Sequence, residues 1–377
     1  MRRIIGLVVM ALATAGAAQA QWALQKSNTT AGLRGIHSLG NGVAWASGTN
    51  GTVLRTTDDG ATWQKCAVPP GAASLDFRAI QGFNERAAMV MSSGPGSQSR
   101  LYKTIDSCKT WTLIYTNPDP SGFWDAYRLG PDQGSGADTD QGLLLGDPVH
   151  GHFPLWVIDI DQTNFEATPL GHRPDSKKDE AAFAASNSSL FIEWTYGMFW
   201  IATGGKNGAR VIRHEMHGHN FQFEYGTYPA AKVPIAHGND SSGIFALAFR
   251  PEPKIPLKPL TFRVGIAVGG DYTKPDDSTA TAAYTLDGGK SWRAAKTMPG
   301  GYRSSVAYDE AAKAWITVGP NGTDISTDDG MNWSAVKPNV ALGESTDADR
   351  NWNAISLPFV VGPHGRIGKL DSAALPK

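Results

Sequence analysis

Four copies of a short motif constrain the fold of this chain more than any other feature. Each copy has Ser or Thr, then Asp two positions later, Gly two positions after the Asp and Trp five positions after it; the second copy has Cys in place of Gly. The copies run from Thr56 to Trp63, from Thr104 to Trp111, from Thr285 to Trp292 and from Ser326 to Trp333. Such a recurring unit indicates a fold built from repeated supersecondary elements.

Each copy predicts a tight turn between two strands. An Asp side chain before Gly accepts hydrogen bonds from nearby backbone N–H groups, and Gly supplies the positive φ of such turns. The Trp that follows buries a large apolar ring on the next strand. A catalytic or metal-binding role for the aspartates is the alternative to this structural role. We predict the structural role for Asp58, Trp63, Asp106, Trp111, Asp287, Trp292, Asp328 and Trp333.

The motif resembles the Asp-box (BNR) repeat, and this resemblance implies a β-propeller in which each box joins the two outer strands of a blade. A second element, an apolar strand with small residues, recurs at intervals of 44 to 61 residues. Its starts are Leu33, Phe77, Phe123, Phe183, Ile244, Tyr302 and Trp352. We therefore predict an all-β fold, a seven-bladed β-propeller of four-stranded antiparallel blades, which forms one domain over residues 21–377.

The two ends of the chain carry further predictions. Residues 1–20 have the basic start, short apolar run and Ala18-Gln19-Ala20 ending of a cleavable signal peptide, so we expect a secreted or periplasmic protein. No later segment is apolar for long enough to span a membrane. The segment Trp22–Gln25 is expected to supply the fourth strand of the last blade and to close the ring.

The two cysteines, Cys66 and Cys108, predict a disulfide, because exported proteins form them readily. The alternative is two thiols whose Cα atoms lie too far apart to be bridged.

Candidate functional residues come from the inner strands and the loops beside them, since such positions carry function in rigid β folds. Arg34, Arg78 and Arg303 each follow the first residue of a predicted inner strand. Together they would bind an anion or a carboxylate, and the alternative is that they form ion pairs within the scaffold. Further candidates that could present an acid or a polar group at a strand end are Asp147, His150, Asp271, Tyr272 and Glu193.

Several function classes are not supported by the sequence. The net charge is −1 with no basic block, so nucleic acid is not an expected partner. No Gly-x-Gly-x-x-Gly fingerprint is present, and we predict no cofactor. The run His214–His219 lacks the His-Glu-x-x-His spacing, and we predict no metal site.

The chain also resembles the photosystem II stability/assembly-factor-like propellers, within the sialidase-like superfamily. The likeness rests on Leu33–Trp63, which includes Gly51–Asp58, and on Tyr302–Trp333. It implies an exported binding or assembly factor, without enzymatic activity, that binds a protein partner or an anionic or carbohydrate ligand at the channel mouth. We expect a monomer.

The alternative is a sialidase-like glycoside hydrolase. A sialidase needs a Tyr nucleophile with a Glu partner, for which Tyr302 and Glu193 are available. The Phe/Tyr-Arg-Ile-Pro motif of sialidases is absent from the sequence.

Overall fold

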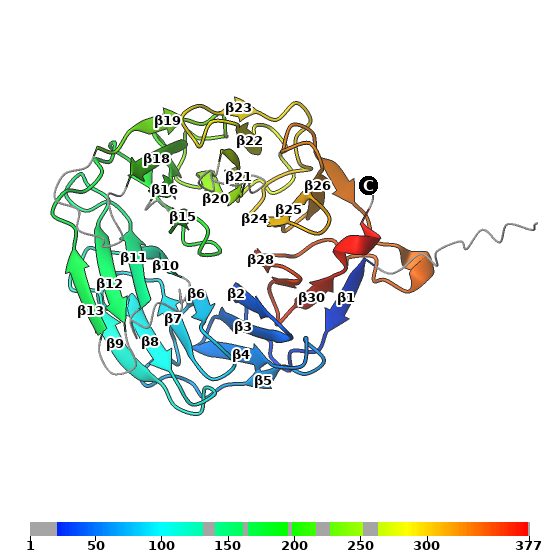
Figure 1. Cartoon of the computed structure of the whole chain (residues 1–377), viewed down its shortest axis with the longest axis horizontal. Helices are drawn as coiled ribbons and strands as arrows, with labels where there is room; N and C mark the ends of the chain where they lie inside the picture. The colour runs from blue at the N-terminus through cyan, green and yellow to red at the C-terminus, as the bar shows by residue number, and fades with distance from the viewer. Residues whose placement is uncertain are drawn as a thin grey trace, which may run out of the picture.

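The chain forms a ring of seven antiparallel sheets around a central axis (Figure 1). The computed structural model describes residues 21–130, 140–160, 165–194, 198–215, 227–251 and 263–375. The predicted signal peptide, His217 and His219 lie outside these residues. The architecture is the predicted seven-bladed β-propeller, and the fold-class prediction is confirmed.

The blades follow one another along the chain, each with its innermost strand first. Blade 1 contains β2 (Leu33–Gly40), β3 (Val43–Gly48), β4 (Thr52–Thr56) and β5 (Gln64–Lys65). Blade 2 contains β6 (Phe77–Gly82), β7 (Ala88–Ser92), β8 (Arg100–Thr104) and β9 (Thr112–Thr116). Blade 3 contains β10 (Trp124–Leu129), β11 (Asp140–Gly146), β12 (Leu155–Ile160) and β13 (Phe165–Pro169). Blade 4 contains β15 (Leu190–Glu193), β16 (Met198–Ala202), β18 (Arg210–Glu215) and β19 (Ala230–Lys232).

The remaining blades repeat this arrangement. Blade 5 contains β20 (Ser242–Arg250), β21 (Val264–Asp271), β22 (Ala282–Thr285) and β23 (Arg293–Ala294), extended by β14 (Glu180–Ala181) and β17 (Gly204–Gly205). Blade 6 contains β24 (Ser305–Asp309), β25 (Ala314–Gly319), β26 (Gly322–Ser326) and β27 (Ser334–Val336). Blade 7 contains β28 (Ala354–Ser356), β29 (Phe359–Val361), β30 (Ile367–Leu370) and β1 (Trp22–Gln25). The 3-10 helices are η1 (Gly96–Gln98), η2 (Val340–Leu342) and η3 (Ser372–Ala374).

The ring is closed by the first strand of the chain, as the sequence predicts. Strand β1 pairs with β30 in an antiparallel ladder that begins with Trp22 opposite Leu370. The indole of Trp22 stacks on that of Trp352 at a ring-centroid distance of 5.8 Å. The first and last strands of the described residues therefore stabilise the same blade, and the outer edge of β30 is covered.

The predicted start of the fourth inner strand, at Phe183, is wrong. The inner strand of blade 4 begins at Leu190, and Phe183 lies in an irregular segment before it. The ring of Phe183 stacks on Phe245 of the next blade at 3.9 Å between centroids. Phe183 is therefore buried by packing against another blade and not as part of a strand, so its apolar side chain did not indicate a strand here.

The propeller has two faces that the chain direction defines. Because neighbouring strands are antiparallel, every inner strand begins at one face, which we call the start face, and ends at the other. The turns between third and fourth strands lie at the face where inner strands end. Four of these turns contain the boxes, so we call this face the box face.

Each box Asp accepts hydrogen bonds from within its own turn. Asp58 Oδ1 accepts from Thr56 Oγ1 at 2.8 Å and from the Thr62 backbone N at 2.9 Å. Asp106, Asp287 and Asp328 accept the corresponding bonds in their turns. The bonds from Thr110 and its neighbours lower the pKa of Asp106 to about 2. These carboxylates are oriented by the turn and not toward the axis.

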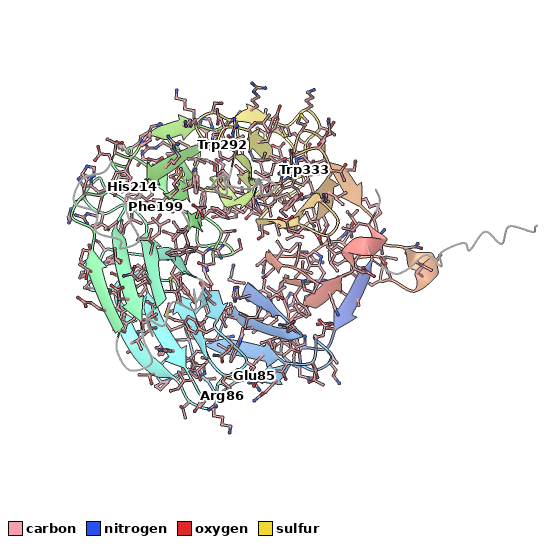
Figure 2. All side chains as sticks on the ribbon, viewed as in Figure 1. Glu85, Arg86, Phe199, His214, Trp292 and Trp333 are labelled. Carbon is pink, nitrogen blue, oxygen red and sulfur yellow. A yellow bond between two sulfur atoms is a disulfide. The ribbon has the colours of Figure 1, made fainter. Side chains whose placement is uncertain are left out.

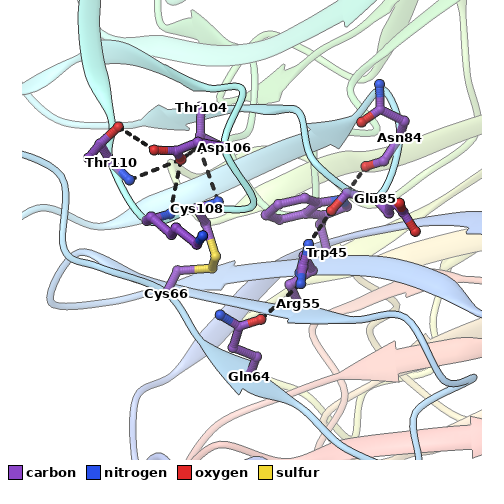
Figure 3. Close-up of a disulfide and its surroundings, with 11 residues drawn as sticks. Trp45, Arg55, Gln64, Cys66, Asn84, Glu85, Thr104, Asp106, Cys108 and Thr110 are labelled. Atoms are coloured by element: carbon purple, nitrogen blue, oxygen red, sulfur yellow. Dashed lines mark hydrogen bonds between the residues drawn. A yellow bond between two sulfur atoms is a disulfide. The ribbon is translucent and has the colours of Figure 1, made fainter.

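The predicted disulfide joins blades 1 and 2. Cys66 follows β5, and Cys108 lies in the second box, where it adopts φ 59° in place of the usual Gly (Figure 3). The two Cα atoms are 5.2 Å apart, within the range that a disulfide bridges. The disulfide prediction is confirmed.

Candidate functional site

Four inner strands carry a β-bulge at the same place near the start face. In each, the ladder to the second strand skips one residue just after the strand begins. A bulge leaves the extra residue unpaired and changes the direction of its side chain. The bulge residues are Arg34, Arg78, Asp125 and Phe245.

Arg34 and Arg78 share a single carboxylate. The Nε atoms of Arg34 and Arg78 lie 3.2 Å and 2.9 Å from Oδ2 of Asp76. Their side chains are 36% and 29% exposed. Arg78 Nη1 also donates to the carbonyl oxygen of Ala184 at 3.3 Å. Two guanidinium groups against one carboxylate leave a net positive charge, and each keeps N–H groups for a further acceptor.

A pair of carboxyl groups lies beside Arg78. Burial and the neighbouring charge of Asp147 raise the pKa of Asp125, while Arg78 opposes this shift. Burial also raises the pKa of Asp147 to about 6, although Asp147 Oδ1 accepts from the Ala182 backbone N at 3.0 Å. Asp125 Oδ2 is buried and has no hydrogen-bond partner among the described residues. The pair therefore retains a proton at mildly acidic pH.

Replacing Asp147 by Asn is expected to change how stability depends on pH. The pKa of Asp147 is higher in the folded chain than in the unfolded chain, so its contribution to stability is present below pH 4 and is lost as the pH rises to about 6. The wild type should therefore lose on the order of 2 kcal/mol relative to Asp147→Asn between pH 4 and pH 7.5. Urea unfolding of both proteins at these two pH values measures this difference. If the stability difference between wild type and Asp147→Asn were the same at both pH values, the pKa of Asp147 would not be raised by folding.

Aromatic side chains cover the start face beside the arginines. Phe245 contacts Phe183 by stacking, and the rings of Tyr302 and Tyr272 meet it edge-on at 4.8 Å and 6.0 Å. Tyr272 is 52% exposed, whereas Tyr302 and Phe245 are buried. Burial raises the pKa of Tyr302, and the positive charge of Arg34 acts against this shift.

Arg303 does not join Arg34 and Arg78. Arg303 lies two residues before Ser305, the first residue of β24 that pairs with β25. Arg34 and Arg78 instead lie inside a bulge, one residue before pairing with the second strand continues. Its Nε donates to Oδ2 of Asp324 at 2.8 Å, and the two side chains are 2% and 3% exposed. Its Nη1 also donates to the carbonyl oxygen of Tyr302 at 2.9 Å. Arg303 is thus a partner in a buried ion pair.

Asp271 and His150 occupy turns at the start face. Asp271 Oδ1 accepts from Ser241 Oγ at 2.7 Å and from Thr273 Oγ1 at 2.6 Å. Burial alone would raise its pKa, but these bonds and one from Asn239 lower it to about 2. His150 has φ 53° in the turn after β11, and its side chain is exposed. Asp271 is therefore an ionised turn residue with its acceptor oxygens occupied.

Glu193 and Tyr302 lie at opposite ends of the propeller. Glu193 is the last residue of β15 and therefore lies toward the box face, while Tyr302 precedes β24 at the start face. The sialidase arrangement of a Tyr nucleophile with a Glu partner is not formed by these two residues.

His214 lies in an aromatic environment in blade 4. His214 and Phe199 lie side by side in this blade (Figure 2), and their rings stack with 5.1 Å between centroids. The ring of Tyr228 lies 4.7 Å from that of His214. Within the described ranges, no three His, Cys, Asp or Glu side chains gather as metal ligands. The same part of the chain contains no helix that is long and apolar enough to cross a membrane.

Sequence reasoning named Tyr272 but missed Asp76, Asp125 and the packing of Phe183 and Phe245 beside it. Asp125 is the second residue of β10, the same position as Arg34 and Arg78 in their strands. The sequence predicts that this strand begins at Phe123, one residue too early, which makes Asp125 its third residue. Phe245 lies in the equivalent bulge of β20, where it is the fourth residue of the strand, and was overlooked because an apolar residue in a strand is expected to enter the core.

Comparisons with known proteins give a structural likeness. No protein-family model and no curated protein matches the sequence. Among solved structures, YCF48 bound to D1 peptide matches with a TM-score of 0.56 and 15% identity, over 93% of this chain and 97% of that chain. YCF48 from Cyanidioschyzon merolae matches with a TM-score of 0.41 and 15% identity, over 94% of this chain and all of that chain. The first likeness shows a shared fold.

Proposed function

We propose that this protein is a binding factor that holds an acidic segment of a protein partner at the start face. The observation that carries the proposal is the pair Arg34 and Arg78, whose side chains are about one-third exposed and share one carboxylate. A carboxylate from a partner would accept bidentate hydrogen bonds from the N–H groups of Arg34 and Arg78 that do not contact Asp76. We also propose that the protein is exported, and the sequence of residues 1–20 supports this.

The aromatic cluster supports a peptide as the bound group. Tyr272 offers an exposed ring over the buried ring of Phe245, next to Tyr302. Aromatic and Arg side chains are the residue types that contribute most at protein interfaces. YCF48, which shares the fold, has been solved with a bound D1 peptide, and this supports a peptide-binding role for the present chain. The expected ligand is an extended segment with acidic residues beside apolar ones.

A selection of peptides tests the proposal without knowledge of the natural partner. Random 12-residue peptides displayed on phage are selected against residues 21–377. We expect Asp and Glu to be enriched beside aromatic or aliphatic residues, because these side chains match the arginines and the rings. Synthetic copies should bind more weakly as the salt concentration rises.

Two further measurements control this experiment. The same selection against Arg34→Gln/Arg78→Gln should lose the acidic enrichment. Fluorogenic sialosides and glycosides should show no turnover with the wild type, which separates a binding factor from a glycoside hydrolase. Selected peptides without acidic residues, or peptides that bind both proteins equally, would contradict the proposal.

A further inference from the structure

A cavity of about 1230 Å³ lies among the inner strands, apart from the arginines of the start face. All seven inner strands contribute to its lining, and each provides an aliphatic side chain. These aliphatic residues are Ile36, Ile80, Leu129, Ile192, Leu247, Val306 and Ile355. Polar and apolar groups share the lining about equally, so the cavity offers both an aliphatic surface and hydrogen-bonding groups to a small molecule.

Arg128 brings a positive charge into this cavity. It is on β10, and its Nε donates to the carbonyl oxygen of Leu190 at 3.2 Å, which fixes the guanidinium. Its Nη1 and Nη2 atoms have no hydrogen-bond or ion-pair partner among the described residues. Burial lowers the pKa of Arg128 to about 10, and no carboxylate is among the groups that act on this pKa. Arg128 is partly buried, and a partly buried cation without a counter-ion favours the binding of an anion.

Two neutral donors accompany Arg128. His37 Nδ1 accepts a hydrogen bond from the Gly82 backbone N at 3.1 Å, so the ring proton is on Nε2. Burial and the nearby charge of Arg128 lower the pKa of His37 to about 4, which keeps the ring neutral. Asn187 Oδ1 accepts from the Tyr127 backbone N at 2.8 Å, and its Nδ2 has no partner in the described part of the chain. All three side chains line the cavity.

The acidic groups do not neutralise this arrangement. Among the described lining residues, Glu85 is the single acid, and it is an exposed residue of the β6–β7 turn. Arg86 follows it at the same turn (Figure 2). The lining therefore includes the guanidinium of Arg128, the donor N–H groups of His37 and Asn187, and an aliphatic wall, together with Lys103 and several hydroxyl groups.

We propose that this cavity binds a small carboxylate with an apolar body, such as a medium-chain fatty acid. The carboxylate would accept two hydrogen bonds from Nη1 and Nη2 of Arg128, and the alkyl chain would lie against the aliphatic wall. This site is separate from the peptide site at the start face, and it does not depend on the function proposed above.

Titration calorimetry with decanoate tests the inference, with decyltrimethylammonium as a probe of equal chain length and opposite charge. The wild type should bind decanoate and not the cation. Arg128→Leu should weaken decanoate binding by at least about tenfold, and Arg128→Lys by less, because an ammonium keeps the charge without the paired geometry. Arg34→Gln/Arg78→Gln should bind decanoate as the wild type does.

The stability of Arg128→Leu provides a second readout. If the role of Arg128 is to bind an anion, Arg128→Leu should leave the urea midpoint of the free protein unchanged or higher. The substitution removes a charge that no other described side chain neutralises. A large decrease in that midpoint would assign Arg128 a purely structural role. Equal binding of decanoate to wild type and Arg128→Leu, or no binding of decanoate by the wild type up to millimolar concentration, would overturn the proposal.

Discussion

Replacing Asp324 by Ala is expected to lower the free energy of unfolding by about 3–5 kcal/mol, because it leaves a buried guanidinium without its partner. Arg303 donates from Nε to Asp324 Oδ2 at 2.8 Å, and both side chains are almost fully buried. Asp324 also accepts from the Gly300 backbone N at 3.3 Å, so the change removes a turn contact as well. Urea unfolding at neutral pH measures the effect.

An exposed ion pair offers the matched control. Lys206 Nζ lies 3.4 Å from Asp240 Oδ2, and both side chains are more than half exposed. Asp240→Ala should therefore cost less than about 1 kcal/mol. The double change Arg303→Met/Asp324→Leu should recover much of the loss, since it removes both charges. If Asp324→Ala cost no more than Asp240→Ala, the ion pair between Arg303 and Asp324 would not stabilise the fold.

The double change Arg34→Glu/Arg78→Glu is expected to weaken binding of a selected acidic peptide by at least about 100-fold. Each guanidinium–carboxylate contact contributes about 1.5–3 kcal/mol, and two such contacts are replaced by repulsion. The new glutamates also face Asp76, which adds to the negative charge at the site. Fluorescence anisotropy with a labelled peptide measures the affinity.

Arg86→Glu is the control for this charge reversal. Arg86 is exposed in the turn between β6 and β7, at the opposite end of the inner strand that carries Arg78. Arg86→Glu should change the affinity for the selected acidic peptide by no more than about twofold, because charges more than a Debye length apart are largely screened. Thermal unfolding of both variants confirms that each is folded. A similar loss of affinity in Arg86→Glu would mean that net charge alone governs binding.

Local patterns in the sequence were sufficient for the fold. The Asp, Gly and Trp of each box lie within eight residues, so their spacing alone predicts the turn. The closing strand Trp22–Gln25 followed from the short last blade, and the disulfide followed from two cysteines in one predicted exported chain. Blade 4 has no box, and the apolar Phe183 was mistaken for its first strand.

The candidate site depends on strand register, which a sequence does not display. Asp125 lies on β10, the first strand of blade 3, and Asp147 directly follows β11, the second, so the two meet because of how these strands pair. A shift of one residue reverses the side of a strand on which a side chain lies. For this reason Arg303, two residues before its ladder, packs against Asp324, whereas Arg34 and Arg78 occupy bulges at the start face.

Hydrogen–deuterium exchange of the chain with and without a selected acidic peptide tests most directly the claim that a partner binds at the start face. The bound peptide should slow exchange in residues 33–36 and 76–79, which carry the two bulge arginines, and around Tyr272. Exchange in the box turns should not change. Protection confined to the box face, with none at Arg34 or Arg78, would contradict the account.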